Sequence, residues 1–204
     1  MNVLIICAGN NLNRGLLKKY AQNADYIICA DGGYNIAKEN GIKPNIVVGD
    51  FDSSEKPDDF FSVVELPREK DETDGLYALK FAVSKKANKI IFYAGLGNRY
   101  DHSYTNMCLL NYALERDIEM VLTDGKTEIY MTDSFLEFEK EKGTAVSVYS
   151  FSDFSYNVNL VGLKYPLIDY NLSKYDIIGT SNEFVDATAR ISTDEGKLMV
   201  IITN

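Results

Sequence analysis

Two aspartates stand two positions apart in the segment Val47-Val48-Gly49-Asp50-Phe51-Asp52-Ser53. If the chain stays extended past Gly49, the side chains of Asp50 and Asp52 point the same way, because strand side chains alternate with period two. Neighbouring carboxylates repel each other, and a hard cation such as Mg²⁺, which prefers oxygen ligands and substrate phosphates, would relieve that repulsion. A polar turn after a strand uses the same residue types. Taken alone, the segment leaves a metal site and a turn both open.

Glycines and charged residues also follow the other short apolar runs of the first half. They are Gly9-Asn10, Asp31-Gly32-Gly33, Arg68 with Lys70-Asp71-Glu72-Thr73-Asp74, and Gly95-Leu96-Gly97-Asn98-Arg99-Tyr100-Asp101-His102. In an open parallel sheet these positions share one edge, the carboxyl ends of the strands, where ligands bind. We therefore expect one acidic, glycine-lined crevice. Its four carboxylates, on Asp50, Asp52, Asp71 and Asp74, would be costly together without a metal ion.

Several of these residues also have a purely structural interpretation. Asp71 suits a helix N-terminus as well as a ligand site, and for Thr73 helix capping is the favoured interpretation. Arg99 is a candidate for a bidentate phosphate contact or a surface ion pair. His102, the only histidine, could cap the fourth helix or orient Asp101. Neither G-x-x-x-x-G-K-[ST] nor G-x-G-x-x-G occurs, so metal, arginine and loop amides would have to hold any nucleotide.

The elements that must position these residues alternate through the first half. Valine- and isoleucine-rich runs predict buried strands, and apolar residues three and four positions apart predict helices between them. We expect strands at 3–8, 26–30, 46–48, 63–66, 90–93 and 120–122, and helices near 14–23, 34–41, 75–87 and 103–116. This alternation is typical of an α/β fold with a mostly parallel, Rossmann-like sheet flanked by helices.

The pattern changes after Gly125. Strands are expected at 128–132, 135–139, 145–151, 157–161, 184–191 and 197–203, with turns at 141–143 and 193–196 and no convincing helix. Runs of strands joined by short turns predict a C-terminal antiparallel β-sandwich. We therefore predict two domains, at 1–124 and 125–204. The second is small, so we expect it to pack on the first or on another subunit.

Composition limits the classes of partner. The net charge of −9 argues against nucleic acid or an anionic membrane surface as the main partner. No apolar run is long enough to span a bilayer. Cys7, Cys29 and Cys108 lie in apolar segments without metal-type spacing, which indicates reduced thiols. We expect a cytoplasmic protein.

With these motifs in order, the chain resembles the thiamine pyrophosphokinase family. The matching segments are A-D-G-G at 30–33, G-D-F-D-S at 49–53, K-D-E-T-D at 70–74, G-x-R-x-D-H at 97–102, and G-L-K-Y-P-L at 162–167 followed by T-S-N at 180–182. The chain departs from the family pattern in having Ala94 and Asn98 at two glycine positions. Tyr165 also stands where family members often carry Trp.

The resemblance implies that ATP and thiamine react to give AMP and thiamine diphosphate. It assigns Mg²⁺ to Asp50, Asp52 and Asp71, with Asp74 as a further ligand or second-shell partner. It places phosphate against Arg99 and the nucleotide pocket around Asp31, Gly32, Gly33, Thr73, Gly97, Asp101 and His102. It places thiamine near Tyr165, Ser181 and Asn182. The family works as a homodimer, with each thiamine bound between the catalytic domain of one subunit and the sandwich of the other.

Other functions remain open at this point. A pyrophosphokinase acting on a pterin alcohol would use the same acidic crevice, although the T-S-N segment and the sandwich favour thiamine. A non-catalytic nucleotide- or thiamine-binding module is disfavoured by the number of carboxylates, because neutral hydrogen bonds hold a ligand at lower cost. Hydrolysis of a phosphate ester is the weakest alternative. Nor does the sequence single out which carboxylate accepts the hydroxyl proton, although Asp71 is one candidate.

Overall fold

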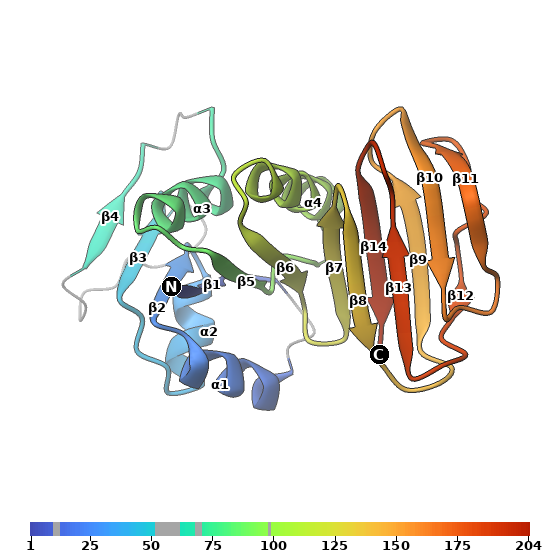
Figure 1. Ribbon diagram of the computed structural model, residues 1–204. Helices are drawn as coiled ribbons and strands as arrows, with labels where there is room; N and C mark the ends of the chain where they lie inside the picture. Colours follow the sequence, from blue (N-terminus) through green and yellow to red (C-terminus); the bar gives the residue numbers. More distant parts are fainter. Residues whose placement is uncertain (10–12, 52–61, 68–70, 98) are drawn as a thin grey trace. The chain divides into compact units, whose positions relative to one another are not determined.

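Strands and helices alternate along the first part of the chain. The computed structural model describes residues 1–9, 13–51, 62–67, 71–97 and 99–204, and the chain divides into two units, Met1–Gly125 and Lys126–Asn204 (Figure 1). The elements of the first unit are β1 (Asn2–Ile6), α1 (Arg14–Asn23), β2 (Tyr26–Ala30), α2 (Gly33–Glu39), β3 (Ile46–Gly49), β4 (Val63–Glu65), α3 (Asp74–Ser84), β5 (Lys89–Tyr93), α4 (Tyr100–Leu114) and β6 (Glu119–Thr123).

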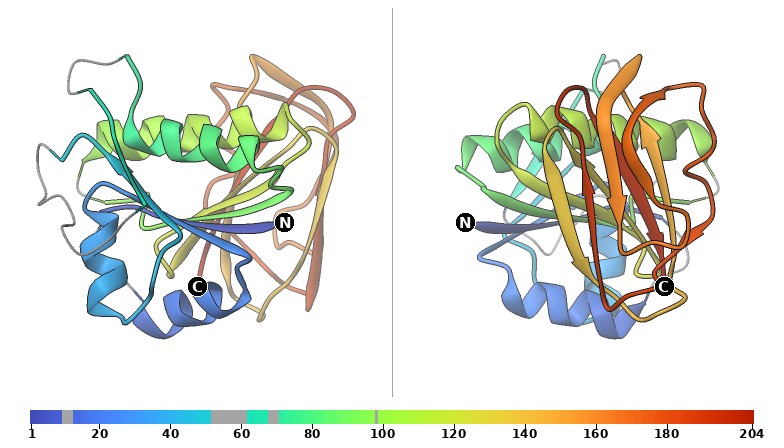
Figure 2. Two further views of the ribbon diagram at one scale, coloured as in Figure 1. Left: turned by 90° about the vertical axis from the view of Figure 1, so that its left-hand side faces the viewer. Right: turned by 45° about the vertical axis from the view of Figure 1, so that its right-hand side comes forward.

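The strands of the first unit form a parallel sheet in the order β6-β5-β1-β2-β3-β4. Because every pairing is parallel, the carboxyl ends of β1, β2, β3 and β5 lie along one edge, as the strand-end residues predicted. Figure 2 shows α1 and α2 on one face of this sheet and α3 and α4 on the other. The expected Rossmann-like α/β architecture is therefore confirmed for this half.

The core of this unit explains the strand pattern. Leu4 and Ile6 of β1 pack with Cys29, Val47 and Tyr93 from the neighbouring strands, and all five are buried. Strands covered on both faces read as continuous apolar runs, which is why the sequence located them correctly. No helix among the described residues is long and apolar enough to cross a membrane.

Helix α4 begins one turn earlier than predicted. Its N-cap residue is Arg99, which makes no side-chain capping hydrogen bond. The usual Ser, Thr, Asp or Asn signal is thus missing at this position, so the sequence placed the start at Ser103. Asp101 and His102 consequently belong to the first turn of the helix. Helix α3 ends at Ser84, short of the predicted residue 87, and Lys86 has a left-handed φ of 62°.

The second unit consists of strands. They are β7 (Thr127–Thr132), β8 (Phe135–Glu139), β9 (Ala145–Ser150), β10 (Phe154–Val161), β11 (Leu167–Ser173), β12 (Asn182–Glu183), β13 (Thr188–Ser192) and β14 (Leu198–Thr203). Strands β12, β9, β14 and β7 are adjacent in one sheet, and β11, β10, β13 and β8 form another (Figure 1). The strand pairings within this unit are antiparallel. The predicted sandwich is confirmed.

Alternating side chains from both sheets fill the core of this unit. In β14, Leu198, Val200 and Ile202 are buried while the residues between them are half-buried. They pack with Val158 of β10 and Ile191 of β13, which belong to the other sheet. This alternation made most strands of this half recognisable in the sequence.

Two features of the second unit differ from the prediction. The expected strand at 184–191 is shorter in the structure, because only its second part forms β13, which extends to Ser192. Strand β12 lies just before the expected range and pairs with β9, whereas β13 pairs with β10 and β8, so the chain crosses between the two sheets from β12 to β13. Strand β11 was not predicted. It lies at the edge of its sheet and Ile168–Asn171 are exposed, so its sequence lacks the alternation that burial imposes.

Candidate active site

A cavity of about 330 Å³ lies at the carboxyl edge of the parallel sheet in the first unit. The ends of β1, β2 and β5 and the beginnings of α3 and α4 supply its walls. The lining residues are Cys7, Ala8, Gly9, Ala30, Asp31, Thr73, Asp74, Gly75, Ala94, Gly95, Leu96, Gly97, Arg99, His102, Ser103 and Asn106. Of the residues predicted from the sequence, the cavity thus brings together Asp31, Thr73, Asp74, Gly97, Arg99 and His102.

The N-termini of two helices meet at this cavity. Thr73 caps α3, because its Oγ1 accepts a hydrogen bond from the Leu76 amide at 3.2 Å, which confirms the capping prediction. Arg99 and His102 at the start of α4 also face the cavity. Unpaired N–H groups and the helix dipole make a helix N-terminus attractive to anions. Two such ends make the cavity suitable for phosphate groups.

Asp74 brings a carboxylate to the end of β1. Its Oδ1 atom is buried, and the residue lines the cavity. Burial raises the pKa of the Cys7 thiol well above its ordinary range, and the nearby Cys29 and Asp74 raise it further. Cys7 is therefore an uncharged thiol at neutral pH. Because the thiolate is the reactive form, Cys7 lines the cavity beside Asp74 without acting as a nucleophile.

Asp31, predicted for the nucleotide pocket, lines the cavity, and its amide donates to the Val48 carbonyl at 2.7 Å, which ties the end of β2 to β3. The other predicted metal ligands lie at different places. Asp50 directly follows β3, and Asp71 is exposed; neither is among the lining residues. Asp52 lies outside the described residues. Within the described part of the chain, no three His, Cys, Asp or Glu side chains form a metal-binding group.

Gly32 and Gly33 serve the packing of α2 against the sheet. A Cβ atom on Gly33 would lie 2.0 Å from the Ile6 carbonyl oxygen, so only glycine lets α2 begin this close to β1. Gly32 is the N-cap of that helix, and neither glycine lines the cavity. Asp31, just before them, has a left-handed φ of 45°. Together these residues fix the turn that presents Asp31 to the cavity.

Arg99 and Asp101 form a bidentate ion pair at the rim. The Arg99 Nε atom donates to Asp101 Oδ1 at 2.9 Å, and Nη2 donates to Oδ2 at 2.6 Å. These hydrogen bonds hold the pKa of the Asp101 carboxyl well below its usual range and raise the pKa of Arg99. The Arg99 side chain is 71% exposed. Arg99 is thus held by Asp101 with much of its surface open to solvent.

Sequence reasoning missed two polar residues of the cavity, Ser103 and Asn106. Both lie on α4, at positions four and seven residues after Arg99, so helical spacing places all three on one face. That spacing was readable once the helix was known to begin at Tyr100. The later predicted start concealed it.

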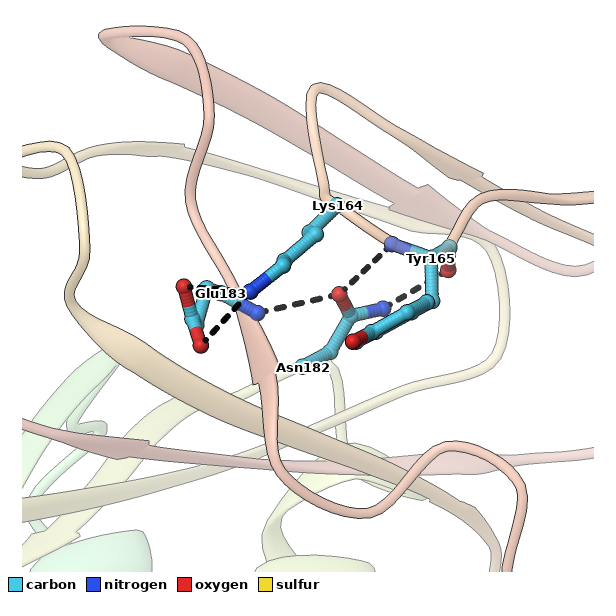
Figure 3. Close-up of polar contacts among 4 residues, drawn as sticks. All are labelled: Lys164, Tyr165, Asn182 and Glu183. Atoms are coloured by element: carbon cyan, nitrogen blue, oxygen red, sulfur yellow. Dashed lines mark hydrogen bonds and ion pairs between the residues drawn. The ribbon is translucent and has the colours of Figure 1, made fainter.

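In the second unit, Asn182 braces the segment that carries Tyr165 (Figure 3). Its buried side chain accepts hydrogen bonds from the amides of Tyr165 and Glu183, both at 2.9 Å, and donates to the Tyr165 carbonyl at 2.7 Å. A Lys164–Glu183 ion pair spans the same two segments, with Nζ 3.3 Å from either carboxylate oxygen. The Tyr165 side chain is exposed, so the brace presents an aromatic ring at the surface of this unit.

Ser181 precedes this brace and is exposed. It has a left-handed φ of 57°, and its amide donates to the Ser147 hydroxyl at 3.1 Å. The segment at 180–182 is therefore held against β9 by its backbone and by the Thr180–Tyr149 hydroxyl pair at 3.0 Å. The Ser181 side chain and the Tyr165 ring are the exposed groups of this region that the sequence assigned to thiamine.

Comparison with known proteins agrees with both units. The profile described as "Thiamin pyrophosphokinase, catalytic domain" matches residues 17–122, which is about half of the chain, and "Thiamin pyrophosphokinase, vitamin B1 binding domain" matches residues 135–198. The chain belongs to the thiamin pyrophosphokinase family. The resemblance inferred from the sequence motifs is thereby confirmed.

Individual relatives extend this agreement over almost the whole chain. Thiamine pyrophosphokinase of Bacillus subtilis is 29% identical over 195 residues, which cover 91% of this chain and 90% of the relative. A crystal structure of the Bacillus subtilis enzyme aligns with a TM-score of 0.90 at 25% identity, covering 100% of this chain and 99% of that chain. One from Geobacillus thermodenitrificans aligns with a TM-score of 0.85 at 27% identity, covering 100% and 98%.

Proposed function

We propose that this chain transfers the pyrophosphoryl group of ATP to the hydroxyl group of thiamine, giving thiamine diphosphate and AMP. The observation that carries the proposal is the cavity at the carboxyl edge of the sheet in the first unit. There the N-termini of α3 and α4, the Arg99 guanidinium and the carboxylates of Asp31 and Asp74 come together in a member of this family. The roles proposed below follow from these positions and from the family motifs.

The donors at this edge fit a magnesium ion. They are carboxylates, and Mg²⁺ usually takes one or two protein carboxylates and completes its shell with water and substrate phosphates. Asp31 and Asp74 line the cavity, so their carboxylates suit that mode of binding. From the family motifs we assign magnesium binding to Asp50, Asp52 and Asp71, with Asp74, which lines the cavity, as a further ligand or a partner that orients the ligands. When bound, the ion would neutralise charge on the triphosphate.

The chain's own residues then position the reactants. In the reaction, the thiamine oxygen bonds to the β-phosphorus, the bond from that phosphorus to the α,β-bridging oxygen breaks, and AMP leaves with this oxygen. Arg99 contacts phosphate, and the helix N-termini stabilise the negative charge that the departing AMP carries. Asp31 to Gly33, Thr73, Gly97, Asp101 and His102 shape the nucleotide pocket. A carboxylate of the cluster accepts the hydroxyl proton, and Asp71 is one candidate.

In the second unit, we propose that Tyr165 and Ser181 contact thiamine. Both side chains are exposed, whereas the described hydrogen bonds of the Asn182 side chain run to the backbone. We assign to Asn182 the role of holding Tyr165 in place. Its direct contact with the thiamine pyrimidine stays a prediction. The division of labour, with 1–124 binding ATP and 125–204 binding thiamine, is part of the same proposal.

We also propose a homodimer with composite active sites. Exposed aliphatic and aromatic side chains on the second unit support a protein partner, with Ile168 at 77%, Tyr175 at 81% and Ile177 at 76% exposure. Sedimentation of the active protein tests this proposal, and a strictly monomeric active enzyme would contradict it. The cytoplasmic location remains an expectation from the sequence.

The decisive experiment incubates the protein with Mg-ATP and thiamine and separates the products by chromatography. We expect AMP and thiamine diphosphate in equal amounts, and none after chelation of the metal. A pterin alcohol in place of thiamine is the control for the acceptor. Formation of ADP and free phosphate, or transfer only to the pterin, would overturn the proposal.

A further inference from the structure

Two side chains of α4 hold the glycine segment that follows β5. The Asn106 Nδ2 atom donates to the Gly95 carbonyl at 2.8 Å. The Ser103 hydroxyl lies 3.2 Å from the Gly97 amide, from which it accepts, and 3.4 Å from the Gly97 carbonyl. Both side chains and all of Gly95–Gly97 line the cavity. The helix is therefore bonded to the cavity wall at both ends of this short segment.

The other side of the same segment packs against Gly9, which follows β1. The Gly9 amide donates to the Ala94 carbonyl at 2.8 Å. A Cβ atom on Gly9 would lie 2.3 Å from both the Ala94 and Leu96 carbonyl oxygens, so the two backbones are in close contact. Gly95 itself is buried. The segment is thus held between the end of β1 and the side chains of α4.

Asn106 also reaches the first turn of α3. Its Oδ1 atom lies 3.2 Å from the place where a Cβ atom on Gly75 would be. Gly75 is the second residue of α3 and follows Asp74, and both line the cavity. The Asn106 side chain therefore bonds the glycine segment and lies next to the start of α3, so that a side chain at position 75 would meet it.

We propose that Asn106 and Ser103 are positioning residues for the reaction. By bonding Gly95–Gly97 to α4 next to the start of α3, they keep the nucleotide part of the cavity formed before ATP arrives. This inference rests on the proposed function for its consequence in catalysis. Without the Asn106 bond, the segment would populate other conformations. The apparent affinity for ATP would then fall in proportion to the fraction of molecules whose segment is in the binding conformation.

The test compares Asn106→Ala with Asn111→Ala. Asn111 lies on the same helix, and its Nδ2 atom donates to Glu115 Oε1 at 3.1 Å, away from the cavity. Loss of one partly buried hydrogen bond predicts a rise in KM for ATP of about fivefold for the Asn106 variant, with KM for thiamine within about twofold. The Asn111 variant is expected to match the unmodified enzyme in both constants.

Hydrogen exchange in the free protein supplies a readout that does not depend on activity. We expect peptides covering Gly95–Gly97 to exchange faster in Asn106→Ala and in Ser103→Ala than in Asn111→Ala. If Asn106→Ala does not fold, Ser103→Ala carries the test alone. If the unmodified chain makes no thiamine diphosphate, the proposed function fails while exchange still tests the brace. Equal exchange and equal KM for ATP in cavity and control variants of an active enzyme would overturn the inference.

Discussion

The brace around Asn182 leads to a quantitative prediction for Asn182→Ala. The side chain is 1% exposed and makes three hydrogen bonds to backbone groups of Tyr165 and Glu183. The substitution removes all three hydrogen bonds at once. The backbone amides of Tyr165 and Glu183 and the Tyr165 carbonyl then have no side-chain partner, and the folded chain shields them from water. We therefore expect the Tyr165 segment to loosen from β12.

The magnitude follows from the bond count. A typical intramolecular hydrogen bond contributes about 1 kcal/mol net, so three of them give a loss of about 3 kcal/mol in the free energy of unfolding. Total stabilities of domains are about 5–15 kcal/mol, so the variant should fold but be clearly weaker. The Lys164–Glu183 ion pair is exposed at both ends and should offset little of this loss.

Urea unfolding followed by circular dichroism measures the change, and Asn171→Ala is the matched control. Asn171 lies on β11 in the same unit, is exposed, and accepts one hydrogen bond from the Asn157 amide at 3.3 Å. Its loss should alter stability by less than about 0.5 kcal/mol. Asn182→Ala should also raise KM for thiamine while leaving KM for ATP unchanged. If both variants lost equally little stability, the brace would not have the role assigned to it.

Three further predictions concern the first unit. Asp52→Asn should abolish nearly all thiamine diphosphate formation with an unchanged circular dichroism spectrum, because it removes a ligand charge at constant shape; unmodified activity would reject Asp52 as a ligand. The lowered pKa of Asp101 means that its pair with Arg99 is complete above the usual aspartate range and is lost only as the pH falls through the lower native value. A carboxyl titration by NMR should show this low midpoint, which should return toward the usual range in Arg99→Gln, and an ordinary midpoint in the unmodified chain would contradict the pair. Ala94 has a left-handed φ of 59°, so Ala94→Gly should raise the unfolding free energy by up to about 1 kcal/mol, and a lower urea midpoint would refute the strain.

The departure at Ala94 shows how motif and structure complement each other. The family pattern has glycine there, and the left-handed φ gives the physical reason for that preference. The sequence identified the departure but contained no backbone angle. Only the fold shows that this residue lies at a turn after β5, where its amide donates to the Thr123 carbonyl at 2.8 Å.

The predicted carboxylates show where sequence reasoning stopped. Their positions after predicted parallel strands led us to expect one common edge, because parallel pairing aligns carboxyl ends. In the structure, however, Asp31 and Asp74 line the cavity, whereas Asp50 and Asp71 are not among its lining residues. How far each turn carries a side chain after its strand depends on contacts such as that of Gly33 with Ile6, which are distant in sequence.

The sequence by itself therefore determined the order of helices and strands, the change from an α/β half to a β half, the Thr73 helix cap and the membership of the family. Each of these depends on residues that are close together in the sequence or on the order of motifs along it. Tertiary structure alone decided which polar side chains form hydrogen bonds that join separate segments of the chain. Asn106 bonds a residue 11 positions away, and Asn182 one 17 positions away. Such hydrogen bonds form only when separate segments are brought together by core packing. Their partners are backbone groups, which leave no signature in the sequence.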